Sequence, residues 1–189
     1  RVGASIPRRP VIGFVARRDE AGRDIVEQLK EKLTPHSNNL VTLSGPGGIG
    51  KTTLAAETAR TLGATFQGRV VWSSADDRPD FALYTLLDDI VTQLGRPDLR
   101  TLAPEQKEAQ VSALVAEPQT LAILDNYETI AQGARQKIEQ WFGQAQCPAL
   151  FTSRHKIPAT DNISIAAMSR EEARDYLERL AGQAVEPHI

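Results

Sequence analysis

Residues 45–52 form an uninterrupted phosphate-binding loop motif, GxxxxGK[ST], directly after the apolar run 40–43. Glycines permit the backbone conformations and the close approach that a loop needs when its N–H groups surround a phosphate. We expect Lys51 to reach the β- and γ-phosphates and Thr52 to offer its hydroxyl to Mg²⁺, at the positive N-terminal end of a helix. A chance glycine-rich turn is the weaker interpretation, because strand, loop and helix patterns occur in the order that the motif requires. The motif consists of Gly45, Pro46, Gly47, Gly48, Ile49, Gly50, Lys51 and Thr52.

Apolar runs alternate with helical periodicity along the rest of the chain. Buried strands are expected at 40–43, 70–72, 121–124, 149–152 and 163–165, with helices between them. This alternation predicts an α/β fold, a three-layer α/β/α P-loop NTPase domain with a mainly parallel five-stranded sheet. The 189 residues, 41% of them hydrophobic, are enough for one sizeable core and favour a single domain.

The last helix is expected to begin at a capping box, in which Ser169 and Glu172 each bond the other's backbone N–H. The residues at helical spacing after it are expected to face inward. They are Ala173, Tyr176, Leu177 and Leu180.

Composition bears on the partners and the location to be expected. The 22 basic and 24 acidic side chains leave a formal net charge of −2, so no basic stripe indicates nucleic-acid binding by this domain. The single cysteine, Cys147, excludes an internal disulfide and favours a reducing interior. No apolar stretch approaches the about 18 residues of a spanning helix, so no membrane association is expected and the cytoplasm is the expected location.

A second motif places an acid at the end of an apolar run. Residues 121–124 are apolar and Asp125 follows them, so its carboxylate is expected at the carboxyl end of a buried strand, across from Thr52 on the water shell of Mg²⁺. A strand-end cap is the alternative for Asp125 alone, but the P-loop upstream makes it a good Walker-B candidate. Asn126 stands where many ATPases have a second acid. Glu128 is the nearest remaining carboxylate that could orient an attacking water, although a solvated loop acid explains it equally well.

Five segments in order resemble the nucleotide-binding core of the STAND ATPases, of the NB-ARC type. They are Phe14-Val15-Ala16-Arg17, GPGGIGKTTLA at 45–55, LAILDNYE at 121–128, Leu150-Phe151-Thr152-Ser153-Arg154, and MSREEARDYLERLAG at 168–182. The resemblance implies a five-stranded P-loop domain that binds ADP or ATP with Mg²⁺ and acts as a switch in signal transduction. One departure is Ala16, where the family usually has glycine.

The resemblance also assigns roles to individual residues. It implies that Phe14, Val15 and Arg17 line the adenine side of the pocket. It further implies that Arg154 senses the γ-phosphate, and a cation at the carboxyl end of a strand beside the phosphate site fits that role. Lys51 and the amides of 47–53, which include Thr53, are expected to hold the phosphates.

The domain boundaries follow from the same resemblance. Residues 1–13 are expected to be an N-terminal linker, 14–182 the nucleotide-binding domain and 183–189 the start of a truncated C-terminal region. In the family, helical and winged-helix segments follow the core. The expected partners are therefore an adenine nucleotide, flanking sensor and effector domains, and other copies of the full-length protein in its ATP state.

The interpretation we favour is a slow Mg²⁺-dependent ATPase whose ADP form is off and whose ATP form assembles. A conventional AAA+ motor or loader and a non-hydrolysing ADP-binding interaction module are the alternatives. A small-molecule kinase would need an arginine-lined acceptor pocket that the sequence does not indicate. A GTPase is disfavoured because no Asn-Lys-x-Asp run occurs.

Overall fold

The computed structural model describes residues 6–10, 13–116 and 119–184. The expected linker residues 1–5 and 11–12, and residues 185–189 of the expected C-terminal region, lie outside this part. In chain order the elements are α1 (Ile25–Lys32), β1 (Leu40–Ser44), α2 (Lys51–Leu62), β2 (Val70–Ser74), α3 (Leu83–Gln93), the 3₁₀ helix η1 (Pro97–Thr101), α4 (Pro104–Ala116), β3 (Leu121–Asp125), the 3₁₀ helix η2 (Tyr127–Thr129), α5 (Gln132–Gln144), β4 (Ala149–Ser153), β5 (Asp161–Ser164) and α6 (Arg170–Ala184).

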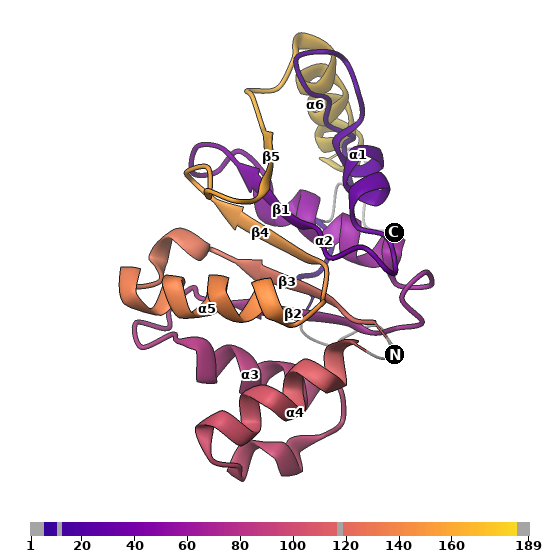
Figure 1. Ribbon diagram of the computed structural model, residues 1–189. Coiled ribbons are helices and arrows are strands. Elements are labelled where there is room, and N and C mark those ends of the chain that lie inside the picture. The colour runs from indigo at the N-terminus through magenta and orange to yellow at the C-terminus, as the bar shows by residue number, and fades with distance from the viewer. Residues whose placement is uncertain (1–5, 11–12, 117–118, 185–189) are drawn as a thin grey trace.

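The strands form one five-stranded sheet in the order β2-β3-β4-β1-β5, and every described pair is parallel (Figure 1). The expected α/β fold is confirmed. The fifth strand covers 161–164, two residues earlier at its start than expected. In the register, Ser44 pairs with Ser153 and Ser74 pairs with Asp125, so the carboxyl ends of these strands meet at one edge. Loops that leave this edge are where open α/β sheets bind ligands.

Helices cover both faces of the sheet because side chains alternate along each strand. Val41 and Leu43 belong to a core shared with α1 and α2. Ala149 and Phe151 belong to the core on the other face, which is shared with α3, α4 and α5. Figure 1 shows the same division, with α1 and α2 on one side and α3, α4 and α5 on the other.

The apolar face of α6 is exposed, which corrects one expectation. The capping box is present, since the Ser169 amide donates to Glu172 Oε2 (2.8 Å) and the Glu172 amide donates to Ser169 Oγ (3.1 Å). However, Tyr176, Leu177 and Leu180 are 36%, 59% and 47% exposed, so the prediction that they face inward is wrong. Helical spacing identifies an apolar face but not the surface that covers it. The helix also continues to Ala184, beyond the expected domain end at 182.

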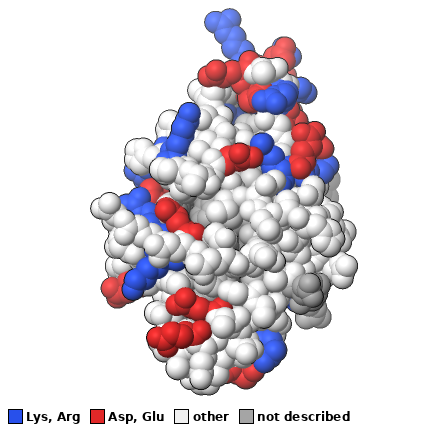
Figure 2. All heavy atoms as spheres, in the orientation of Figure 1, with Lys and Arg blue, Asp and Glu red and all other residues white. Residues whose placement is uncertain are grey.

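The surface carries charges of both signs. Figure 2 shows Lys and Arg intermixed with Asp and Glu on the face it displays. Among the described helices, none combines the length and the apolar composition that crossing a lipid bilayer requires.

Candidate functional site

The loop between β1 and α2 has the backbone conformation of an anion-binding turn. Gly48 and Gly50 have φ of +74° and +101°. A Cβ on Gly48 would meet nothing within 4 Å, so the left-handed conformation rather than space requires glycine there. Gly50 is the N-cap of α2 and contributes no side-chain hydrogen bond to this helix end. The first amides of a helix have no intrahelical partner, so this end is available to an anion.

Lys51 is buried beside the same loop. The residue is only 7% exposed, and its Nζ donates to the carbonyl oxygens of Gly45 (2.9 Å) and Pro46 (3.0 Å). An ammonium has three donors and no acceptor, so one donor remains for a ligand. These two bonds fix the charge against the loop without neutralising it.

Asp125 lies across from the start of α2, at the end of β3. Its Oδ1 accepts hydrogen bonds from the hydroxyls of Thr52 (2.9 Å) and Thr152 (2.5 Å), and the residue is 3% exposed. Burial raises the pKa of the Asp125 carboxyl, and the two hydroxyl donors oppose part of that effect. Thr152 in turn accepts from the amide of Asn126 (3.0 Å), which fixes its hydroxyl.

The Thr52 and Asp125 oxygens fit a magnesium ion. Mg²⁺ takes few protein ligands and usually completes its shell with water and substrate phosphates. Within the part of the chain that the structure describes, no group of three or more His, Cys, Asp and Glu side chains gathers as a metal cage. A hydroxyl and a buried carboxylate beside an anion site are the donor set that a nucleotide-borne cation needs.

Arg154 follows β4 and lies over the P-loop. Its Nε donates to Glu128 Oε1 at 3.1 Å, and its guanidinium atoms lie 3.8–3.9 Å from where a Cβ on Gly47 would be. Glu128 Oε2 is buried and has no hydrogen-bond partner among the described residues. Both side chains line a cavity of about 300 Å³ with Asn126 and with P-loop residues. The P-loop residues are Gly47, Gly48, Gly50, Lys51, Thr52 and Thr53.

A second cavity, of about 270 Å³, lies on the other side of the P-loop. The three residues expected on the adenine side, Phe14, Val15 and Arg17, all line it. The sequence did not indicate Met168 and Tyr176, which come from the segment before α6 and from α6 itself. The sequence signal for both is the MSREEARDYLERLAG segment, whose helical spacing predicts a helix that faces the core.

Arg17 holds the wall of this cavity rather than offering a free charge to it. The residue is 4% exposed, and its two terminal nitrogens donate to the carbonyls of Ile49 (2.9 Å) and Ala166 (2.7 Å). Its Nε lies 3.5 Å from Glu172 Oε2. Arg17 therefore joins the P-loop, the segment after β5 and α6.

Glu172 connects α6 to the N-terminal segment, which Figure 1 shows beside α6. Besides closing the capping box, it accepts from the amide of Arg18 (2.8 Å). Burial by itself raises the pKa of the Glu172 carboxyl, but the amides of Ser169 and Arg18 and the charge of Arg17 outweigh it and leave the pKa below its usual value.

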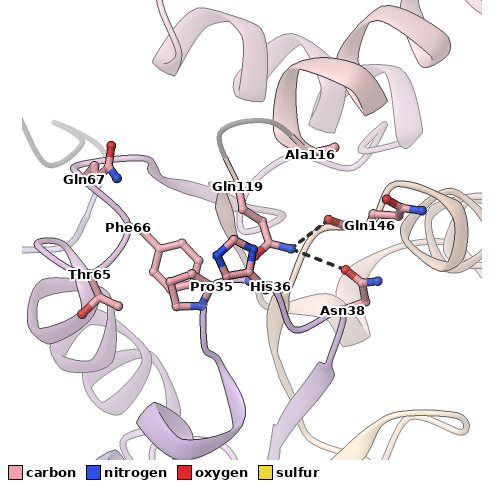
Figure 3. Close-up of a pocket in the computed structure, with 9 residues that line it drawn as sticks. All are labelled: Pro35, His36, Asn38, Thr65, Phe66, Gln67, Ala116, Gln119 and Gln146. Carbon is pink, nitrogen blue, oxygen red and sulfur yellow. Dashed lines mark hydrogen bonds between the residues drawn. The ribbon is translucent and has the colours of Figure 1, made fainter.

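A further cavity, of about 430 Å³, lies at the amino ends of the strands (Figure 3). Its centre is Gln119, whose side-chain amide donates to the carbonyl of Gln146 (3.2 Å) and to Asn38 Oδ1 (3.5 Å). Three of its residues, His36, Gln67 and Gln146, have positive φ. None of the described residues that line it is Lys, Arg, Asp or Glu. A polyanion needs cations and free amides, so the chemistry favours the P-loop edge over this cavity.

A sequence model of the NB-ARC domain matches residues 22–184. The chain belongs to the NB-ARC family. It is thus an NB-ARC nucleotide-binding domain, and the expected family is confirmed. The match begins at 22 and ends at 184, whereas the sequence analysis placed the domain at 14–182. No curated protein matches the chain.

Solved structures share the fold of this NB-ARC domain at low identity. Cdc6p from Pyrobaculum aerophilum is 15% identical with a TM-score of 0.68, and the match covers 95% of this chain and 52% of the Cdc6p chain. Domain III of the Thermotoga maritima replication initiation protein DnaA is 13% identical with a TM-score of 0.61, covering 94% and 76%. A STAND protein with a tetratricopeptide repeat sensor from Pyrococcus horikoshii is 15% identical with a TM-score of 0.55, covering 92% and 27%. The chain therefore spans about half of Cdc6p and about a quarter of the STAND protein.

Proposed function

We propose that this NB-ARC domain is the ATP/ADP switch of a STAND signalling protein and hydrolyses ATP slowly with Mg²⁺. The observation that carries the proposal is the 2.9 Å hydrogen bond between Thr52 and Asp125, which joins the P-loop helix to the end of β3. A hydroxyl and an acid at this spacing beside Lys51 are the parts that hold a nucleotide's phosphates and its cation.

Each group in the site has a separate role in this proposal. Lys51 and the free amides at the start of α2 hold the phosphates, and Thr52 and Asp125 hold Mg²⁺. A bound Mg²⁺ would offset the negative charge of the phosphates. Arg154 contacts the γ-phosphate. The cavity lined by Phe14, Tyr176 and other residues takes the adenine, and we call it the base-side cavity.

We infer slow hydrolysis because the site offers one acid, Glu128, that could orient the attacking water, and this acid is already paired. Asn126 follows Asp125 where a second acid would stand, and Glu128 is held by Arg154. Glu128 can orient an attacking water only after Arg154 has left it, so hydrolysis depends on a side-chain movement first. Flanking sensor and effector domains, assembly of the full-length protein with ATP, and a cytoplasmic location belong to the same proposal.

Two alternatives make different predictions. An AAA+ motor would show fast turnover and a stable ring, while a pure ADP-binding module would show no difference in assembly between ATP and ADP. The slow switch requires that ATP and ADP give different oligomeric states in the full-length protein, and a chain that assembles identically with both is not this switch.

Titration calorimetry with ATP and Mg²⁺ tests the site itself. Lys51→Ala removes the charge held against the loop, so we expect nucleotide binding to be abolished. Lys30→Ala is the matched control, because Lys30 pairs with Glu27 on the surface of α1. Wild-type affinity in the Lys51 variant would overturn the site assignment, and an equal loss in both variants would mean that general charge, not this site, binds the nucleotide.

A further inference from the structure

The ion pair between Arg154 and Glu128 lies at the phosphate cavity, which both side chains line. Arg154 follows β4 and Glu128 follows β3, yet Arg154 Nε lies 3.1 Å from Glu128 Oε1. The two side chains differ in exposure, 62% for Arg154 and 14% for Glu128. Arg154 is therefore mostly exposed to solvent, whereas Glu128 is mostly buried.

Glu128 has an unused capacity for hydrogen bonds. Its Oε2 is buried without a partner among the described residues, although its Oε1 accepts from Arg154. A buried carboxylate oxygen without a donor is costly, which makes Arg154 the main compensation for the Glu128 charge. Lys51 lines the same cavity, but its Nζ donates to the P-loop carbonyls instead.

A terminal phosphate bound at the P-loop would compete with Glu128 for this guanidinium. Arg154 lies over Gly47, at the turn that surrounds the phosphates, within the reach of one flexible side chain. Phosphate carries more charge than a carboxylate and accepts from the same planar donors. A diphosphate leaves the outer part of the cavity without a competing anion, so Arg154 keeps its bond to Glu128.

We propose that Glu128 is a positioning residue that sets the preference between ATP and ADP, because it competes with the γ-phosphate for Arg154. The inference rests on the proposed function. With ADP, Arg154 stays on Glu128. With ATP, Arg154 turns to the γ-phosphate, and both oxygens of Glu128 become free to accept a hydrogen bond from water in the same cavity.

A double-mutant cycle tests this exchange. Affinities for ADP and for a non-hydrolysable ATP analogue, each with Mg²⁺, are measured by calorimetry for wild type, Glu128→Gln, Arg154→Ala and the double variant. Glu128→Gln releases Arg154, so we expect about two- to fivefold tighter binding of the triphosphate and unchanged ADP affinity. Arg154→Ala weakens the triphosphate and leaves ADP unchanged.

The decisive comparison is the effect of Glu128→Gln in the two backgrounds. Competition for Arg154 requires a larger gain in triphosphate affinity in the wild-type background than in the Arg154→Ala background. An equal or larger gain in the Arg154→Ala background means simple charge repulsion and overturns the proposal. A loss of triphosphate affinity in Glu128→Gln also overturns it, because Glu128 would then help to hold the nucleotide.

Two control variants distinguish competition for Arg154 from a general effect of charge. Asp98→Asn breaks the exposed Arg96–Asp98 pair at 2.8 Å, outside all the site cavities, and is expected to leave both affinities unchanged. Arg154→Lys keeps the charge but lacks the planar fork, so part of the coupling with Glu128 should return. Failure of wild type to bind either nucleotide would overturn the proposed function, whereas independent effects of the two substitutions overturn only the exchange.

Discussion

Thr52 and Asp125 are 73 positions apart in the chain, and the Thr52 hydroxyl donates to Asp125 Oδ1 at 2.9 Å. The bond connects the first turn of α2 to the end of β3. Thr152 donates to the same oxygen, so two hydroxyls compensate one buried carboxylate. The two hydroxyls therefore hold the Asp125 carboxylate in place at the end of β3.

Replacing Asp125 by Asn separates two effects of its buried charge, the loss of folding stability and the proposed binding of Mg²⁺. The amide oxygen can still accept from both hydroxyls, while the charge that burial disfavours is removed. We expect the free energy of unfolding without nucleotide to rise by an amount on the order of 1 kcal/mol. The Mg²⁺ dependence of ATP binding should weaken. Thermal melts and calorimetry with and without Mg²⁺ measure both effects, and a destabilised variant without nucleotide would contradict the argument.

The Asp125 carboxyl also predicts a pH dependence. Its pKa in the folded state is raised above the ordinary value of 3.8 by burial, so the folded state binds this proton more tightly than the unfolded state does. As pH falls from neutral toward 3.8, the Asp125 carboxylate takes up a proton. The free-energy cost of burying its charge then disappears, and so does the negative charge proposed to bind Mg²⁺. The Mg²⁺-dependent gain in ATP affinity should decline at higher pH than an ordinary aspartate would give. The phosphates of the nucleotide also titrate in this range. Subtracting the pH profile of ATP affinity measured for Asp125→Asn removes their contribution.

The parallel sheet and the P-loop edge could be predicted from the sequence because their signals are local. Buried strands such as Leu121–Asp125 are continuous apolar runs, and the phosphate loop is a contiguous motif. Parallel strands then bring their carboxyl ends together, so the proximity of Thr52 and Asp125 followed from topology.

The remaining contacts depend on long-range packing that no local pattern encodes. Thr152 reaches Asp125 from a neighbouring strand, and nothing in its own segment marks it as a donor. Tyr176 lines the base-side cavity because α6 lies beside the N-terminal segment through Arg17 and Glu172, not because of its helical spacing. The same spacing gave the wrong burial for α6, since its apolar face has no cover among the described residues.

Glu172→Gln should loosen the wall of the base-side cavity. Gln preserves the capping box but cannot match the charge of Arg17 and both amide donors, so we expect a loss of about 1–2 kcal/mol in the free energy of unfolding near neutral pH. The folded pKa of Glu172 is lowered, so its contribution is present above the unfolded value of 4.5 and disappears as pH falls through the folded value. Melts across this range should show the two proteins converging at low pH. A constant difference at all pH values would assign the effect to packing instead.

Tyr176→Ala should weaken ADP and ATP equally. The residue lines the base-side cavity and not the cavity lined by Lys51 and Arg154, so its aromatic ring should contribute to both nucleotides alike. We expect a loss on the order of 1 kcal/mol for each. Tyr84→Ala is the matched control, since Tyr84 is 39% exposed on α3 and lines none of the cavities described above. A loss confined to ATP would place the ring near the γ-phosphate and contradict the assignment of this cavity to the base.

The exposed face of α6 predicts an unusual tolerance of polar substitution. Leu177 and Leu180 are 59% and 47% exposed, so replacing both by Gln should change the free energy of unfolding by no more than about 0.5 kcal/mol each. Leu29→Ala is the contrast, because Leu29 is fully buried on the inner face of α1 and its loss should cost about 2–5 kcal/mol. Chemical denaturation of the domain measures all three variants. A cost above about 1 kcal/mol for either α6 leucine would mean that a surface covers this face, and the helical spacing would then have indicated its burial correctly.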